Sequence, residues 1–432
     1  MKTHALRLLS EHGMILILLL LGAFFSAVTL TEQSITGDTA VEQITASIRK
    51  EHRVLIATRP ATEESALADA IAAKTKAIGA QVIAVIKGSP ADVRSVLSQQ
   101  KQPLDIIVAG PESARWLILS EASAEFPSIG SPLLLKPESY RWPNFLKTDN
   151  LLNIANQIAV IAIIAIGMTM VIITAGIDLS VGSLLALAAV GASWFIREYA
   201  GAQEASAGGM LVACFLAILL CGAAGGFSGL MITRFNIPPF IVTLAMMLVT
   251  SGFAYTLSEG QSIYQVPDSF VWLGRGADLF RLPNAVLLMG VLYGLAHVIM
   301  TQTRIGRYLY AVGGNREAAH ISGVPVNRVL LFAYVISGLL AGLGGVVMAS
   351  QLKSGSPTYG GMYELYVIAA VVVGGTSLSG GKGTMLGTLT GAFIIAVIQN
   401  GMNLTNVESY TQKVVLGGVI LGAVLVDQWR RH

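Results

Sequence analysis

Charged residues are distributed very unevenly along this chain. Of its 53 Asp, Glu, Lys and Arg residues, 27 lie between Thr31 and Asn150, 23 lie from Leu151 to His432, and three precede Thr31. Overall the chain is 53% hydrophobic and 12% charged, whereas soluble domains carry about 25% charged residues. The composition excludes an ordinary soluble globular protein and predicts a membrane protein with water-soluble material inserted near its start.

The apolar runs predict an all-α polytopic membrane protein with about ten transmembrane helices, because each crossing needs about 20 apolar residues. Met14–Leu30 comes after a basic start and is interpreted as an uncleaved first helix; a secretory signal peptide is the alternative, and both would export residues 31–150. The eighth and ninth spans are short or glycine-interrupted, which is typical of broken or re-entrant segments. The nine further spans are predicted at 151–174, 180–197, 209–233, 238–257, 283–302, 328–351, 364–377, 384–400 and 411–427.

Basic residues predict the orientation of these spans. With the N-terminus in the cytoplasm, ten basic residues fall on the inner side and five in short outer loops, as the positive-inside rule requires. We therefore expect a multi-pass plasma-membrane protein with both termini cytoplasmic and residues 31–150 outside. The inner residues are Lys2, Arg7, Arg234, Arg304, Arg307, Arg316, Arg328, Lys382, Arg430 and Arg431; the outer ones are Arg197, Arg275, Arg281, Lys353 and Lys413.

Residues 31–150 are predicted to form a small α/β domain between the first and second transmembrane helices, whose regions are 1–30 and 151–432. Apolar β-rich runs alternate with helical patterns, which favours a parallel sheet. Ser89 is the predicted N-cap of a helix with Pro90 at its first position. A structural or docking domain is favoured, and a ligand-sensing half-domain is the alternative. The predicted strands are Val54–Thr58, Val82–Ile86 and Leu104–Ala109.

The stretch 167–183, with the sequence GMTMVIITAGIDLSVGS, contains the single acid between Asp149 and Glu198, namely Asp178. A carboxylate among apolar helices is costly unless it is paired or hydrated. Two interpretations stay open. Asp178 contributes to a gate, or Asp178 or Ser180 accepts backbone N–H bonds at the start of the third span.

The longest predicted cytoplasmic loop, residues 303–328, contains a short polar helix. Asn315 is the predicted cap of the helix Arg316–Ile321, and Gly323 is its predicted stop. Such a helix, held between two spans, is suited to receive force from a soluble partner. A solvated loop with a capped helix fits the same spacing.

Polar residues isolated in apolar spans are candidates for a translocation path or gate, beside Asp178 and Ser180. Hydrogen bonds between helices are the alternative for each of them. No Cys/His cluster has the spacing of a metal site, so neither a metal nor a cofactor is predicted. The net charge of +3 is too small to indicate a nucleic-acid partner. The candidates are Asn156, Thr243, Glu364, Asn400 and Asn403, with Asn153 and Gln157 at the start of the second span.

Three motifs in one order give a more specific indication: GMTMVIITAGIDLSVGS, AVGGNREAAHISGV (311–324) and VVVGGTSLSGGKGT (371–384). Together they resemble the ribose-type permease subunits of bacterial ATP-binding-cassette importers, in the branched-chain amino acid/ribose permease family. The resemblance covers about 151–427 and a plausible first span. It implies a sugar-importing, non-enzymatic subunit of the bacterial inner membrane, working by alternating access.

The resemblance also implies partners: a second permease subunit, identical or related, a cytoplasmic ATPase that hydrolyses ATP, and a periplasmic solute-binding protein. It further implies an ATPase-coupling loop. The coupling positions are Gly313, Gly314, Asn315, Arg316, Glu317, Ala318, Ala319 and Gly323. The insert of about 120 residues departs from the short link usual in that family. An ion-coupled secondary transporter, or a membrane-anchored sensor that uses the insert, are the alternative functions.

Overall fold

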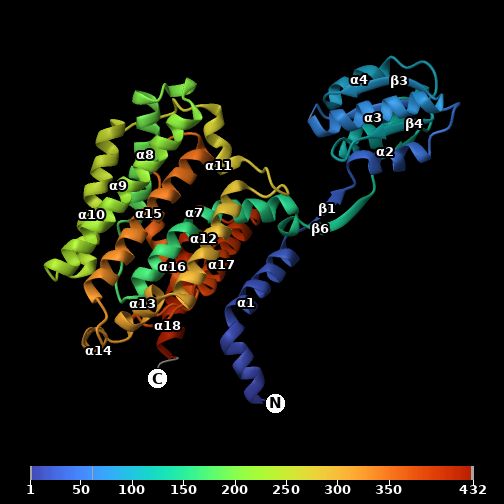
Figure 1. Ribbon diagram of the computed structural model, residues 1–432. Coiled ribbons are helices and arrows are strands. Elements are labelled where there is room, and N and C mark those ends of the chain that lie inside the picture. The colour runs from blue at the N-terminus through green and yellow to red at the C-terminus, as the bar shows by residue number, and fades with distance from the viewer. Residues whose placement is uncertain (1, 61, 430–432) are drawn as a thin grey trace. The chain divides into compact units, whose positions relative to one another are not determined.

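The computed structural model describes residues 2–60 and 62–429. The chain divides into two compact units (Figure 1). Leu30–Pro143 forms one unit, here called the insert. The chain up to Thr29 and from Asn144 onward forms the other, here called the helical unit. Each unit is described by itself.

Ten apolar helices make up most of the helical unit as described. Seven of them are long and apolar enough to cross a membrane: α7, α8, α9, α10, α12, α15 and α17. Shorter apolar stretches lie in α1, α16 and α18. The bounds are α1 Lys2–Val28, α7 Thr148–Ile173, α8 Val181–Tyr199, α9 Ala207–Arg234, α10 Pro239–Ser258, α12 Asn284–Gln302, α15 Val326–Leu352, α16 Tyr363–Val373, α17 Met385–Leu404 and α18 Ser409–Trp429.

Short helices connect these elements. They are the α-helices α11 Trp272–Arg275, α13 Arg304–Gly314 and α14 Arg316–Ile321, and the 3-10 helices η3 Asn144–Leu146, η4 Ala202–Glu204 and η5 Asp268–Val271. Of the two spans predicted to be broken, only the eighth is short, since α16 has 11 residues. The ninth was wrongly predicted to be interrupted: α17 is a continuous helix of 20 residues, and its glycines pack against neighbouring groups.

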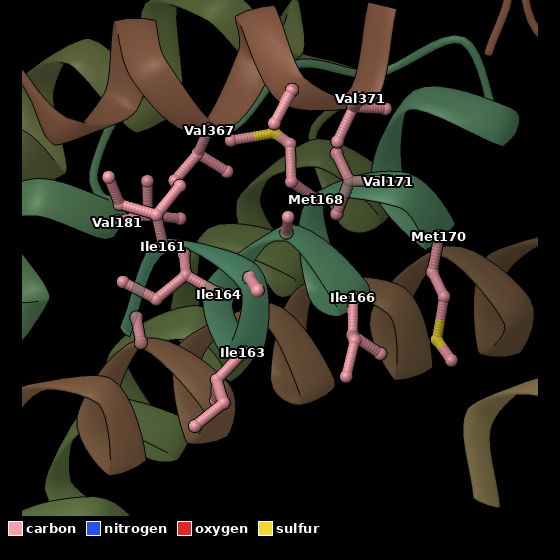
Figure 2. Close-up of a cluster of buried hydrophobic side chains, with 14 of the residues drawn as sticks. Ile161, Ile163, Ile164, Ile166, Met168, Met170, Val171, Val181, Val367 and Val371 are labelled. Carbon is pink, nitrogen blue, oxygen red and sulfur yellow. The ribbon is translucent and has the colours of Figure 1, made fainter. Parts of the chain in front are cut away.

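α7 lies at the centre of the helical unit and is buried on all sides from Ile158 to Ile173. Its Ile161, Ile164 and Met168 pack with Val181 of α8 and with residues of α16 (Figure 2). A helix that is apolar all round is typical of the core of a large bundle or of a membrane span. The helix α7 therefore runs through the helical unit and also forms its hydrophobic core.

Glycines allow α9 and α15 to approach closely. A Cβ atom on Gly338 would lie 2.3 Å from the carbonyl oxygen of Cys221, and one on Gly225 would lie 2.3 Å from that of Tyr334. Small residues at such contacts bring helix backbones together in membrane proteins. Gly338 and Gly342 therefore serve close packing of α15 against α9.

The insert contains a parallel four-stranded sheet in the order β3-β2-β4-β5. Alternate residues face opposite sides, so Val54 and Ile56 pack under α2 (Gly37–Ala46) and α3 (Thr62–Ile78), while Leu55 and Ala57 pack under α4 (Pro90–Ser98). The first three strands overlap the three runs predicted as strands; β5 was not predicted. The strands are β2 Arg53–Thr58, β3 Gln81–Lys87, β4 Ile106–Ala109 and β5 Leu133–Leu135.

Two further strands begin and end the insert. β1, Leu30–Ser34, pairs antiparallel with β6, Ser139–Pro143. The two connections to the helical unit therefore leave the insert side by side. The helices of the insert are α2 Gly37–Ala46, α3 Thr62–Ile78, α4 Pro90–Ser98, α5 Leu117–Ser120 and α6 Ala122–Glu125, with the 3-10 helices η1 Ser113–Arg115 and η2 Pro127–Ile129.

Asp92 stabilises the start of α4. Its carboxylate accepts hydrogen bonds from the backbone N–H of Ser89 at 2.7 Å and from the hydroxyl of Ser89 at 2.8 Å. Ser89 is the N-cap and Pro90 comes next, as predicted. The bonds from Ser89 lower the pKa of the Asp92 carboxyl below its usual 3.8. The charged form is therefore favoured by folding.

A lowered pKa in the folded state adds stability above the unfolded pKa, and this contribution disappears as the pH falls through the folded value. We expect Asp92→Ala to lower the urea midpoint of residues 30–143 at pH 7, and the deficit to shrink below about pH 3.8. Circular dichroism of the isolated insert measures both. Glu51→Ala, at an exposed acid of the same unit, is the control. A deficit that is constant from pH 7 to pH 2 would contradict the assignment.

Candidate coupling and translocation sites

The predicted coupling segment forms α13 and α14, which are separated by Asn315. The Asn315 side chain accepts a hydrogen bond from the backbone N–H of Ala318 at 2.9 Å, which satisfies a free donor at the helix start. Gly323 has a φ of +82°, a left-handed conformation that favours glycine after a helix. The predicted cap and stop are confirmed.

α14 exposes a surface of mixed chemistry. Arg316, Glu317 and Ala318 are exposed, and Ile321 at the end of the helix is 86% exposed. Ala319, one of the predicted coupling positions, lies on the opposite side of α14 and is buried against the rest of the helical unit. α14 and α13 lie at one end of the helical unit and α11 lies at the other (Figure 1).

Gly313 lies at a junction of all three sequence motifs. A Cβ atom on Gly313 would lie 1.7 Å from the carbonyl oxygen of Ile173, the last residue of α7, so only glycine fits there. The same oxygen accepts a hydrogen bond from the backbone N–H of Gly381 at 2.8 Å. These three residues form a contact that we call the Gly313 junction. It joins the end of α13 to the end of α7 and to the loop between α16 and α17.

Asp178 is fully buried, and its carboxylate accepts three hydrogen bonds. One oxygen accepts from the backbone N–H and hydroxyl of Ser180 at 3.0 and 2.6 Å, and the other accepts from the hydroxyl of Ser337 on α15 at 2.7 Å. Ser180 precedes α8, but its hydroxyl donates to Asp178 and does not cap the helix backbone. Asp178 therefore anchors the start of α8 to α15, and a role as a gate stays a prediction.

Other helices enclose the same segment. The hydroxyl of Thr243, on α10, donates to the carbonyl oxygen of Ile177 at 3.2 Å. Tyr334 of α15 is buried, and its hydroxyl lies 2.5 Å from where a Cβ atom on Gly176 would be. Within the part of the chain that the structure describes, that hydroxyl has no hydrogen-bond partner. The non-helical stretch 174–180 is thus held between α10 and α15.

A second non-helical stretch, residues 353–362, leads to the start of α16. There a Cβ atom on Gly182 would lie 2.5 Å from both a carboxylate oxygen of Glu364 and the carbonyl oxygen of Gly360. The starts of α8 and α16 therefore meet. Helix N-termini carry partial positive charge that nearby acids offset. Glu364 and Asp178 are the acids at these two helix starts.

The other predicted path residues lie elsewhere and bond neighbouring helices. Asn156 donates its amide to a backbone carbonyl of α11 at 3.2 Å. Asn400 exchanges two amide hydrogen bonds with Asn150, at 2.8 and 3.0 Å, which tie α17 to α7. Asn403 accepts from a glutamine of α18 at 2.8 Å. These contacts match the alternative of hydrogen bonds between helices.

Three residues of these sites were not singled out from the sequence. Ser337 and Tyr334 lie within the long apolar run of α15, and no spacing along the chain relates them to Asp178. Ile321 is an ordinary apolar residue at the end of a short helix. In each case the missing signal was the position of another element, which only the fold supplies.

Comparison with known proteins places the helical unit among membrane permeases. The family described as branched-chain amino acid transport system / permease component matches residues 150–424. The ribose import permease protein RbsC of Escherichia coli strain K12 is 44% identical over 289 residues, which cover 66% of this chain and 87% of that protein.

The matches to two further relatives extend over nearly the whole length of each relative. RbsC of Bacillus subtilis strain 168 is 41% identical over 304 residues, 70% of this chain and 92% of the relative. The D-allose transport system permease protein AlsC of Escherichia coli strain K12 is 33% identical over 331 residues, 77% of this chain and 96% of the relative. No solved structure matches the chain.

The Gly313 junction can be tested with neighbouring glycines. A Cβ atom on Gly313 would overlap the Ile173 carbonyl, whereas one on Gly314 meets nothing within 4 Å. We expect Gly313→Ala to destabilise the detergent-purified protein by about 1–3 kcal/mol or more, the usual cost of overpacking, and Gly314→Ala to leave it unchanged. Thermal unfolding followed by size-exclusion chromatography measures this. Equal stability of the two variants would contradict the junction.

Proposed function

The chain belongs to the family of branched-chain amino acid transport system permease components, and we propose that it forms the membrane path of an ATP-binding-cassette importer for a monosaccharide. Such a subunit is a transporter and not an enzyme, since a separate ATPase hydrolyses the ATP. The observation that carries the proposal is the similarity to ribose import permeases over 87 to 92% of their length. Relatives named for allose and arabinose support the sugar class.

We propose a ten-helix topology in the bacterial inner membrane, with both termini cytoplasmic and the α/β insert periplasmic. The basic residues on α13, α14 and the start of α15 support this orientation. Arg275 and Lys353 lie at the other end of the unit, where Arg275 donates to the Gln351 carbonyl and Lys353 pairs with Asp268. The described part of α18 ends at the same end of the helical unit as α14 (Figure 1). Arg430 and Arg431 lie outside the described residues.

The proposed mechanism is alternating access driven from the cytoplasm. A ligand shifts a two-state equilibrium only by its differential affinity for the two states. ATP binding and hydrolysis would change the affinity of the ATPase for each state of the permease, and α14 is the proposed point of contact. From there the Gly313 junction connects movement of α13 to α7 and to the loop ahead of α17.

The proposed partners are a cytoplasmic ATPase, a periplasmic solute-binding protein and a second permease subunit, identical or related. We propose that the insert, which the sequence predicts as a domain of residues 31–150, acts outside the membrane as a docking or structural domain. Its fold supports this: it has its own sheet and two hydrophobic clusters, one on each face. The paired strands β1 and β6 close it at its base.

Coupling through α14 can be tested at Ile321. Burying an isoleucine side chain in an interface contributes about 1.5–3 kcal/mol, so we expect Ile321→Ser to reduce ATPase retention on tagged permease roughly tenfold. Phe280→Ser is the matched control, because Phe280 is equally exposed, at 86%, but precedes α12. Co-purification and sugar uptake are measured together. Normal retention and uptake in Ile321→Ser would refute contact at this residue.

A further inference from the structure

A cavity of about 260 Å³ lies in the helical unit, where α7 begins, α15 ends and α16 starts. Its size is slightly below that of typical sites for drug-sized ligands, about 300–1,000 Å³. It therefore suits a small solute. The lining residues come from four helices: Ile154, Gln157, Ile158, Ile161, Met348, Gln351, Leu352, Tyr363, Ala396 and Gln399.

The polar groups of this cavity are three primary amides and one phenol, and none of its lining residues carries a charge. Gln157 on α7, Gln351 on α15 and Gln399 on α17 each present two N–H donors and a carbonyl acceptor. A sugar hydroxyl is both donor and acceptor, so amides satisfy it in either role. An ionic solute would find no counter-charge here and would pay for desolvation.

The amides differ in how far the protein already uses them. Gln351 donates its side-chain N–H to the backbone carbonyl of Asn156 at 2.9 Å, which fixes its position and leaves its carbonyl oxygen available. Gln157 and Gln399 make no side-chain hydrogen bond to any residue that the structure describes. Two free amides therefore face a cavity beside one that is held in place.

The remaining walls suit the C–H faces of a sugar ring. Ile158, Ile161 and Met348 line the cavity with apolar side chains, and Tyr363 adds an aromatic ring. That ring packs edge-on against Tyr366, with centroids 6.2 Å apart and an interplanar angle of 71°. Small-molecule sites characteristically combine apolar walls with a few placed polar groups.

A larger cavity of about 760 Å³, between α9, α11 and α15, lacks these features. Its lining is almost entirely apolar, and Leu211 and Phe215 there are 72% and 59% exposed. Such side chains suit lipid. Of these two cavities, the smaller one combines amides with an aromatic face.

We infer that the Gln157–Gln351–Gln399–Tyr363 cavity is a binding subsite for an uncharged, polyhydroxylated ring solute on its way through the permease. The inference rests on the proposed function and adds the residues that receive the solute. The solute-binding protein captures the solute before it reaches this subsite. Loss of the subsite should therefore lower the maximal uptake rate and change the apparent KM less.

The test uses the complete importer in cells, with radiolabelled D-ribose, D-allose and L-arabinose as probes. We expect Gln157→Leu and Gln399→Leu each to lower the maximal uptake rate at least fivefold, with unchanged membrane abundance and ATPase co-purification. Gln203→Leu is the matched control, since Gln203 is an exposed glutamine of η4 that does not line the cavity. Uptake at the unaltered rate in both glutamine variants would overturn the subsite while leaving the proposed function intact.

A second measurement separates binding from folding. In a background with both native cysteines replaced by serine, Gln157→Cys should react with a hydrophilic maleimide, and the transported sugar should slow that reaction severalfold. Gln203→Cys, in the exposed η4, should react at the same rate with or without sugar. Labelling of Gln157→Cys that sugar does not slow would overturn the subsite. No uptake of any of the three sugars by the unaltered importer would overturn the proposed function and the subsite together.

Discussion

The buried carboxylate of Asp178 is the constraint on which the helical unit depends. Backbone inside a membrane must have its polar groups satisfied within the protein, yet after α7 the chain runs through residues 174–180 as non-helical backbone. Asp178 binds Ser180 at the start of α8 and Ser337 in the middle of α15. The non-helical segment is thereby fixed between rigid helices, and the start of α8 is placed where it meets α16.

That arrangement links the proposed cytoplasmic contact to the interior. α14 is short and exposed, but a glycine at the end of α13 fits directly against the last carbonyl of α7. Because packed interfaces have few alternative arrangements, a displacement at such a contact is passed on and not absorbed. α7 in turn forms the core and lines the cavity near its own start. One helix therefore connects the proposed site of ATPase contact with the proposed site of solute contact.

The insert shows how a soluble fold can be placed in a membrane protein without disturbing it. Its two ends leave through the paired strands β1 and β6, so the insertion needs little more than two adjacent connections. The strand order β3-β2-β4-β5 puts helices on both faces, and each face has its own hydrophobic cluster. The insert therefore has a core separate from that of the helical unit, as independently folding domains do.

The apolar spans, the α/β character of the insert and the capped helix at Asn315 could be predicted from the sequence. All of these depend on local pattern: runs of apolar residues, alternation of strands with helices, and a side chain within reach of the next turn. The contact of Gly313 with Ile173, the bond between Ser337 and Asp178, and the cavity shared by three glutamines could not be predicted from the sequence. Those contacts join residues far apart in the chain, and the packing of helices, which no local pattern encodes, brings them together.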